Sequence, residues 1–206
     1  MSKKEGYSYL NGNKWVDITR EERFFCLVAY NYFNDNPYEA VNWINQKCEL
    51  GLDSAIIDKQ NWEIGFEVAL YRDYIHLEEK GFSDEEDRFR KRTFDLCFFS
   101  EAYLIIIEAK AYSRFDSEQL KVFKKDKNDI PDRILNRCIS NTEVKFVALI
   151  SHHYSPSKES IDGIFNCKIT ANRSIEHFPA PPHGSTGNQP TPAWWGNVCQ
   201  PVQDVP

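Results

Sequence analysis

The sequence has no long hydrophobic run and no cysteine pair at the spacing of a metal site. Its longest wholly apolar stretch, residues 24–30, is far shorter than the ~18–20 residues that cross a bilayer. Polar residues follow the N-terminal lysines where a signal peptide would have its apolar core. The six cysteines form no C-x-x-C pair and no zinc-ribbon pattern, so neither a disulfide framework nor a zinc site is indicated. We expect a soluble, cytoplasmic protein without a membrane partner, its thiols reduced and mostly buried.

The sequence also lacks a basic excess. Its 25 Lys and Arg residues stand against 31 Asp and Glu residues, a formal net charge of -6 at pH 7. A strongly basic balance is the simplest sign of a nucleic-acid-binding protein, so any such partner must be bound by a local site. The length of 206 residues, with 41% hydrophobic and 27% charged residues, is typical of one globular domain.

Three segments in the first part of the chain show helical patterns. Thr19 and Glu22 have the form of a capping box, which predicts a helix over residues 20–33. An Asn-Pro pair predicts the start of a second helix over residues 37–48. Apolar residues at helical spacing predict a third helix over residues 62–74.

The pattern changes after residue 92. Residues 93–99 and 102–109 are rich in aromatic and β-branched side chains around a short turn, which predicts a β-hairpin. A helix over residues 117–125 and a buried strand over residues 143–151 follow, and residues 163–170 are a candidate for a further strand. Helices before and after a central sheet indicate an α/β domain.

A charged pattern lies inside the predicted hairpin, with Asp95 on the first strand and Glu108 and Lys110 on the second. Strand side chains alternate between faces, so Glu108 and Lys110 point the same way. A two-residue turn leaves Glu108 diagonal to Asp95, whereas a four-residue turn sets the two directly opposite. Either turn brings the two carboxylates to one face.

Carboxylates inside apolar strands are costly to bury unless their charge is compensated. A divalent cation would do so, and Mg²⁺ binds through one or two carboxylates while it keeps waters and substrate phosphates as its other ligands. Such a cation makes a bound water easier to deprotonate, and the ammonium of Lys110 could orient that water or stabilise the transition state. The alternative is a structural cluster of salt bridges at the end of the sheet.

Asp95 with Glu108-Ala109-Lys110 resembles the bipartite active-site motif of the PD-(D/E)XK nuclease superfamily. Phe94 stands where the nominal motif has proline, a substitution that the superfamily widely tolerates. The resemblance implies a restriction-endonuclease-like α/β fold, in which helices flank a central mixed β-sheet, here with extra N-terminal helices. It covers roughly residues 60–150.

The resemblance implies further site residues. It expects an acidic residue on a helix before the hairpin, which the predicted helix 62–74 supplies as Glu67 or, one turn earlier, as Glu63. It expects a glutamine on the helix after the motif lysine, and Gln119 occupies that place. Asp95, Glu108 and Glu67 would hold Mg²⁺, for which Mn²⁺ could substitute, while Lys110 and Gln119 complete the catalytic set.

The implied function is metal-dependent hydrolysis of phosphodiester bonds in DNA, by an endonuclease rather than an exonuclease. Basic side chains within residues 88–92 and 121–127 are candidates for phosphate contacts. Analogy of fold allows a homodimer. The alternatives are a catalytically inactive module of the same fold, which binds nucleic acid or a protein partner, and an ordinary α+β core with coincidental charges.

On this interpretation the chain has three parts. Residues 1–58 form an N-terminal helical part of the domain, and residues 59–176 form the nuclease core. Residues 177–206 hold seven of the ten prolines and are expected to be a flexible tail, whose Trp194-Trp195 pair could dock on the body or on a partner.

Overall fold

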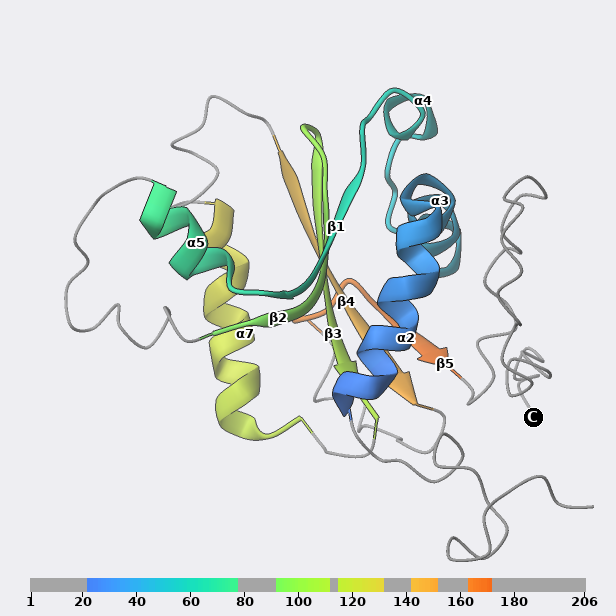
Figure 1. Cartoon of the computed structure of the whole chain (residues 1–206). Helices are drawn as coiled ribbons and strands as arrows, with labels where there is room; N and C mark the ends of the chain where they lie inside the picture. The colour runs from blue at the N-terminus through green and yellow to red at the C-terminus, as the bar shows by residue number, and fades with distance from the viewer. Residues whose placement is uncertain (1–21, 78–91, 112–114, 132–141, 152–162, 172–206) are drawn as a thin grey trace, which may run out of the picture.

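The chain forms a five-stranded mixed sheet with helices on both faces (Figure 1). The computed structural model describes residues 22–77, 92–111, 115–131, 142–151 and 163–171. The strands lie in the order β1-β2-β3-β4-β5. The α/β class with a mixed sheet between helices, as expected from the sequence, is confirmed.

The first three strands form an antiparallel meander, and the last two extend it in parallel. β1 (Glu63–Val68) pairs with β2 (Phe94–Phe99), and β2 pairs with β3 (Tyr103–Lys110). β4 (Glu143–Ser151) lies parallel to β3, and β5 (Cys167–Ala171) lies parallel to β4. β3 is buried along its whole length because strands flank it on both sides and helices cover both faces of the sheet.

Helices α2 (Glu22–Asp35), α3 (Pro37–Cys48) and α4 (Ser54–Ile57) cover one face of the sheet (Figure 1). The Asn36 side chain accepts a hydrogen bond from the N–H of Glu39 and caps α3, as the Asn-Pro pair predicts. Both predicted helices of this face are therefore confirmed from residue 22 onward. They pack on a core that includes Phe33, Val41, Ile44, Leu96, Phe98, Ile105 and Val147.

Helices α5 (Leu70–Leu77) and α7 (Ser117–Asp129) cover the other face (Figure 1). The predicted helix over residues 117–125 is confirmed and runs one turn further. A second apolar core lies beneath these helices and includes Phe94, Cys97, Ile106, Phe123, Phe146 and Ile150. The sheet thus separates two cores, and residues that alternate along β3 contribute to each.

The predicted helix over residues 62–74 is wrong, because these residues hold β1 and the start of α5. Ile64, Val68 and Tyr71 have helical spacing, but the backbone of β2 needs a hydrogen-bonding partner and β1 supplies it. A Cβ atom on Gly65 would lie 2.5 Å from Cγ2 of Val68, so glycine fits the close packing along this strand. Tertiary pairing overrides the local periodicity here.

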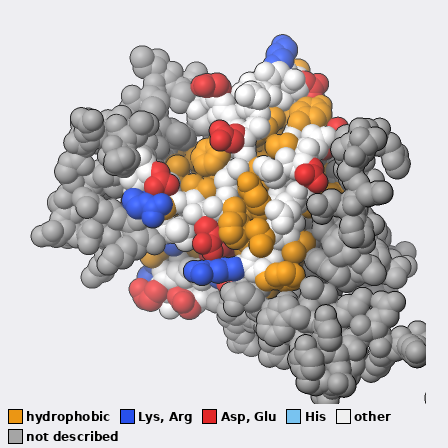
Figure 2. Space-filling view, in the orientation of Figure 1, with side chains coloured by type: hydrophobic (Ala, Val, Ile, Leu, Met, Phe, Trp, Pro, Cys, Tyr) orange, Lys and Arg blue, Asp and Glu red, His pale blue; other side chains and the backbone are white. Residues whose placement is uncertain are grey.

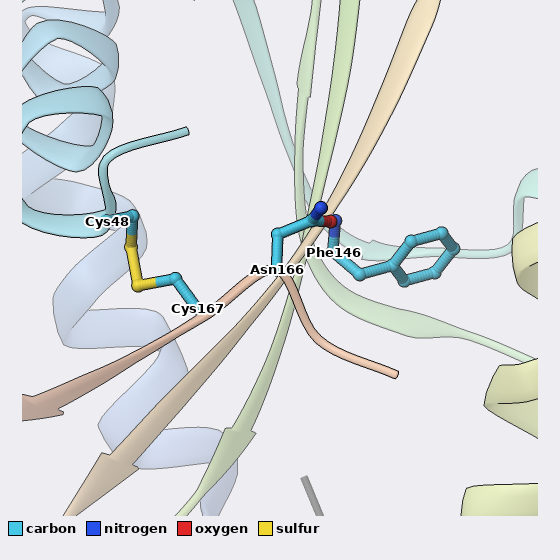
Figure 3. The surroundings of a disulfide bond; sticks show 4 residues. All are labelled: Cys48, Phe146, Asn166 and Cys167. Atoms are coloured by element: carbon cyan, nitrogen blue, oxygen red, sulfur yellow. A yellow bond between two sulfur atoms is a disulfide. The ribbon is translucent and has the colours of Figure 1, made fainter. Parts of the chain in front are cut away.

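The expectation that the cysteines are reduced is wrong for one pair. Cys48 at the end of α3 and Cys167 at the start of β5 form a disulfide, with Cα atoms 5.2 Å apart (Figure 3). The two residues are 119 positions apart, so no local spacing could indicate the bond. Beside it, the N–H of Phe146 donates to the side-chain oxygen of Asn166, which holds the start of β5 against β4 (Figure 3).

Some expectations lie outside the described residues, namely the Thr19 cap and the tail over residues 177–206. The further strand begins only at Cys167, later than expected. Two other cysteines, Cys26 and Cys97, are buried free thiols. Within the described ranges, no helix is long and apolar enough to cross a membrane.

Candidate functional site

The hairpin turn decides how Asp95 and Glu108 face each other. The register pairs Leu96 with Ile107, and residues 100–103 form the turn. Continued by one residue, this register sets Asp95 opposite Glu108. The longer of the two turns considered from the sequence is therefore the one observed.

Asp95 is partly buried at the start of β2. Its Oδ2 atom accepts a hydrogen bond from the N–H of Ala109 at 2.7 Å. Burial raises the pKa of Asp95 to about 6, although this N–H and the ammonium of Lys110 act in the opposite direction. The carboxylates of Glu22 and Glu67 raise that pKa further. Asp95 thus lacks sufficient positive charge nearby.

Glu108 lies deeper and is only 7% exposed. Its Oε1 atom accepts a hydrogen bond from Nε2 of Gln119 at 2.9 Å and lies 3.7 Å from Nζ of Lys110. Burial and, after it, the charge of Asp95 raise the pKa of Glu108 to about 8. Gln119 of α7 therefore lies at the site, where the resemblance expects a glutamine.

Lys110 is a buried cation at the end of β3, only 6% exposed. Its Nζ atom lies 3.4 Å from Oε2 of Glu22 and 5.4 Å from the centre of the Phe115 ring. This ammonium has a carboxylate on either side, since Glu108 is its other neighbour. Contacts from α2 and from β3 hold the Lys110 side chain in place, and its positive charge interacts with both Glu22 and Glu108.

Glu22 is a site residue that sequence reasoning missed. It is the first described residue of α2, and its Oε1 atom accepts a hydrogen bond from the N–H of Ala111 at 3.0 Å. The capping-box pattern with Thr19 had assigned this carboxylate to its own helix. The sequence carried one signal for Glu22, because the resemblance expects an acidic residue on a helix before the hairpin. Helix α2 supplies such a residue, whereas residues 62–74 do not form the predicted third helix.

Glu67 lies on β1 rather than on a helix, and the paired residues on either side of it set it beside Asp95. Its backbone φ is 48°, a left-handed conformation that costs a non-glycine residue about 1–2 kcal/mol. Its Oε1 atom lies 3.0 Å from Nε of Arg23. Glu63 pairs with Phe99 near the turn, roughly 13 Å along the sheet from Asp95 at strand rise, so it does not belong to the site.

The predicted basic contacts are only partly described. Arg92 is turned inward, with Nε 2.7 Å from Oδ2 of the fully buried Asp126, so it is not free for a phosphate. Lys121 pairs with Glu118 on the surface of α7, and Lys127 donates to a backbone oxygen. Residues 88–91 lie outside the described residues.

Acidic side chains outnumber cations among the described residues of the site. The carboxylates of Asp95, Glu108, Glu22 and Glu67 lie near Lys110 and Arg23. Arg92, which pairs with Asp126, also lowers the pKa of Glu108. The described residues therefore leave a net negative charge, which a divalent cation would offset.

The donor atoms also fit Mg²⁺. One oxygen each of Asp95 and Glu108 is held by an N–H group, and within the described part of the chain their other oxygens accept no hydrogen bond. Among the described residues, no group of three Asp, Glu, His or Cys side chains is placed to hold a metal ion, so Glu67 does not join Asp95 and Glu108 as a third ligand. Mg²⁺ needs only one or two carboxylates, because waters and substrate phosphates fill its other positions.

This arrangement could hold a divalent cation next to a buried ammonium, which is the chemistry that phosphoryl hydrolysis requires. Comparison of the chain with protein-family models, with curated proteins and with solved structures found no match.

Proposed function

We propose that the protein is a Mg²⁺-dependent endonuclease that hydrolyses phosphodiester bonds in DNA on a restriction-endonuclease-like fold. The observation that carries the proposal is the meeting of Asp95, Glu108 and Lys110 on adjoining strands, where carboxylates outnumber cations among the described residues. A purely structural cluster of salt bridges would favour charges in equal number, because an uncompensated buried charge is costly.

The elements around the hairpin support the proposal. Helix α2 precedes the hairpin and brings Glu22 to Lys110, and α7 follows it and brings Gln119 to Glu108. These are the places where the resemblance to PD-(D/E)XK nucleases expects an acid and a glutamine. Glu22 is thus the first candidate for the acid that completes the site, and Glu67 on β1 is the second.

In the proposed mechanism Asp95 and Glu108 would hold the metal ion, which would lower the pKa of a bound water and neutralise charge on a phosphate oxygen. Lys110 orients the water or stabilises the charge that develops in the transition state, from a position already fixed between Glu108 and Glu22. Gln119 holds one oxygen of Glu108, so this carboxylate is oriented before substrate binds.

Cleavage of closed circular DNA tests the proposal, because only an endonuclease can cut a molecule without ends. We expect nicked and linear products with Mg²⁺ or Mn²⁺ and none with EDTA. Asp95→Asn should lower the cleavage rate by about 10³-fold, several kcal/mol of transition-state stabilisation, because the metal loses a charged ligand.

Glu143→Gln is the matched control, since Glu143 is an exposed carboxylate at the opposite end of the neighbouring strand β4. It should cleave at the wild-type rate. Cleavage that persists in Asp95→Asn would sink the assignment. A protein that neither binds Mn²⁺ in calorimetry nor cleaves DNA would instead be the inactive module of the same fold. A homodimer stays part of the proposal. The expected cytoplasmic location loses the support of reduced thiols, because Cys48 and Cys167 form a disulfide.

A further inference from the structure

Arg23 is an exposed cation at the edge of the candidate site. It follows Glu22 on α2, whose carboxylate contacts Lys110. The Arg23 side chain is 77% exposed, whereas that of Lys110 is 7% exposed. A large ligand that approaches the buried ammonium would meet the guanidinium of Arg23 first.

Glu67 connects this guanidinium to the metal-binding pair. It lies beside Asp95 in the sheet, and its charge contributes to the raised pKa of that carboxyl. It also lies 3.0 Å from Nε of Arg23, and φ of 48° takes its backbone out of the regular strand. One carboxylate therefore faces both the cation site and an exposed arginine.

Arg23 is the one basic residue of helix α2. Figure 2 shows orange hydrophobic side chains in the middle of the face seen in Figure 1, and the Lys and Arg side chains of the described residues lie apart from one another there. Leu27, also on α2, is 40% exposed. On the described part of this face, a phosphate would therefore be bound by single basic side chains such as Arg23.

We propose that Arg23 is a substrate-binding residue that exchanges Glu67 for a DNA phosphate next to the cleaved bond. The planar guanidinium has paired donors that match a phosphate as well as a carboxylate. The exchange keeps every group compensated, because the divalent cation replaces Arg23 as the positive neighbour of the acidic cluster. This inference rests on the proposed nuclease function.

The test measures binding of a short fluorescent DNA duplex by anisotropy, with Ca²⁺ in place of Mg²⁺ and at several salt concentrations. We expect Arg23→Gln to weaken binding about tenfold and to reduce the salt slope by about one, as loss of one phosphate contact does. Arg23→Lys should restore the slope. The matched control is Arg72→Gln, since Arg72 is an exposed arginine with Nε 2.9 Å from Asp73, away from the site on α5.

Glu67→Gln provides a change of opposite sign. In EDTA it should bind DNA several-fold more tightly than the wild type, because Arg23 is released. The double variant Arg23→Gln with Glu67→Gln should lose most of that gain.

The outcomes separate the two proposals. Wild-type affinity and salt slope in Arg23→Gln would overturn the role of Arg23 and leave the nuclease intact. An Arg23-dependent affinity without any cleavage would support the contact and contradict the nuclease. A wild-type protein that binds no DNA would overturn both.

Discussion

Two clusters of buried charge contact helix α7, and they differ in their balance. In the first, Arg92 pairs with Asp126, and Tyr71 donates a hydrogen bond to the same carboxylate at 2.7 Å. The guanidinium of Arg92 lies 5.0 and 4.2 Å from the ring centres of Phe94 and Phe123. One cation pairs with one anion here, and the cluster joins the start of β2, α5 and α7.

The second cluster is the candidate site, where the described carboxylates outnumber the cations. Burial raises the pKa of Asp95 and of Glu108, as it also raises the pKa of Asp126 in the first cluster. The two clusters therefore differ in their balance of charge rather than in their burial. A balanced pair stabilises the packing, whereas we propose that the excess of negative charge binds a divalent cation.

The sharpest test of this difference is Glu108→Gln. We expect cleavage to fall by about 10³-fold, because a metal ligand loses its charge. The melting temperature at pH 8 should nevertheless rise by a few degrees, since the variant removes a carboxylate whose charge is disfavoured by burial and whose cation, Lys110, is shared with Glu22. Calorimetry and a cleavage assay on the same preparation measure the melting temperature and the cleavage rate. A lower melting temperature would contradict the proposed difference between the two clusters.

Asp126→Asn should change the melting temperature in the opposite direction. It leaves the Arg92 guanidinium buried without its carboxylate, which costs about 3–5 kcal/mol of unfolding free energy. For a chain of this length, that loss lowers the melting temperature by roughly 10 °C. Glu118→Gln removes an exposed carboxylate from the same helix and should leave the melting temperature unchanged. Equal stability of the two variants would mean that the buried pair contributes nothing.

Gln119→Ala is expected to have a smaller effect on activity. Loss of the hydrogen bond at 2.9 Å leaves the Glu108 carboxylate free to rotate, and partners of this kind usually contribute 10–100-fold in metal affinity or activity, as a rough range. The Mg²⁺ dependence of the cleavage rate should shift to higher concentration. Gln119→Glu should be worse than alanine, because it adds a further negative charge beside Glu108.

The last prediction concerns the pH dependence of stability, in which the contribution of Mg²⁺ is the smallest change expected. The folded-state pKa values of about 6 for Asp95 and about 8 for Glu108 lie above the ordinary range of carboxyls near 4. Between about pH 4 and 8 the folded protein therefore binds more protons than the unfolded chain, and its stability falls as the pH rises. Mg²⁺ should oppose this trend by stabilising the ionised carboxylates, by about 1.4 kcal/mol at ten times its dissociation constant. Melting curves with EDTA and with Mg²⁺ at several pH values check this, and parallel curves would contradict it.

Much of the framework followed from local patterns. The apolar strands on either side of a turn, the Asn-Pro start of α3 and the strand at residues 143–151 were all predictable, because each depends on side chains close in sequence. The sequence also placed Asp95 and Glu108 on one face of the hairpin, because strand side chains alternate between the two faces. The sequence did not decide between a turn of two residues and a turn of four, and the structure has the four-residue turn, 100–103.

The misses depend on partners distant in the chain. Residues 63–68 form a strand because β2 offers them a hydrogen-bonding edge, and Cys48 meets Cys167 because α3 packs against β5. Glu22 joins the site because α2 lies across the sheet where β3 ends. Neither periodicity nor spacing carries information of this kind.

By itself, the sequence determined an α/β domain with an acidic pair and a lysine inside an apolar hairpin. Strand alternation and hydrophobic periodicity extend over a few neighbouring residues, so they can be recognised from the sequence alone. The tertiary structure decided that Glu22 of α2 contacts Lys110, that Gln119 holds Glu108, and that the described carboxylates outnumber the cations around Lys110. Charge balance in a buried site is a sum over neighbours in space, and only the packing of α2 and α7 on the sheet defines those neighbours.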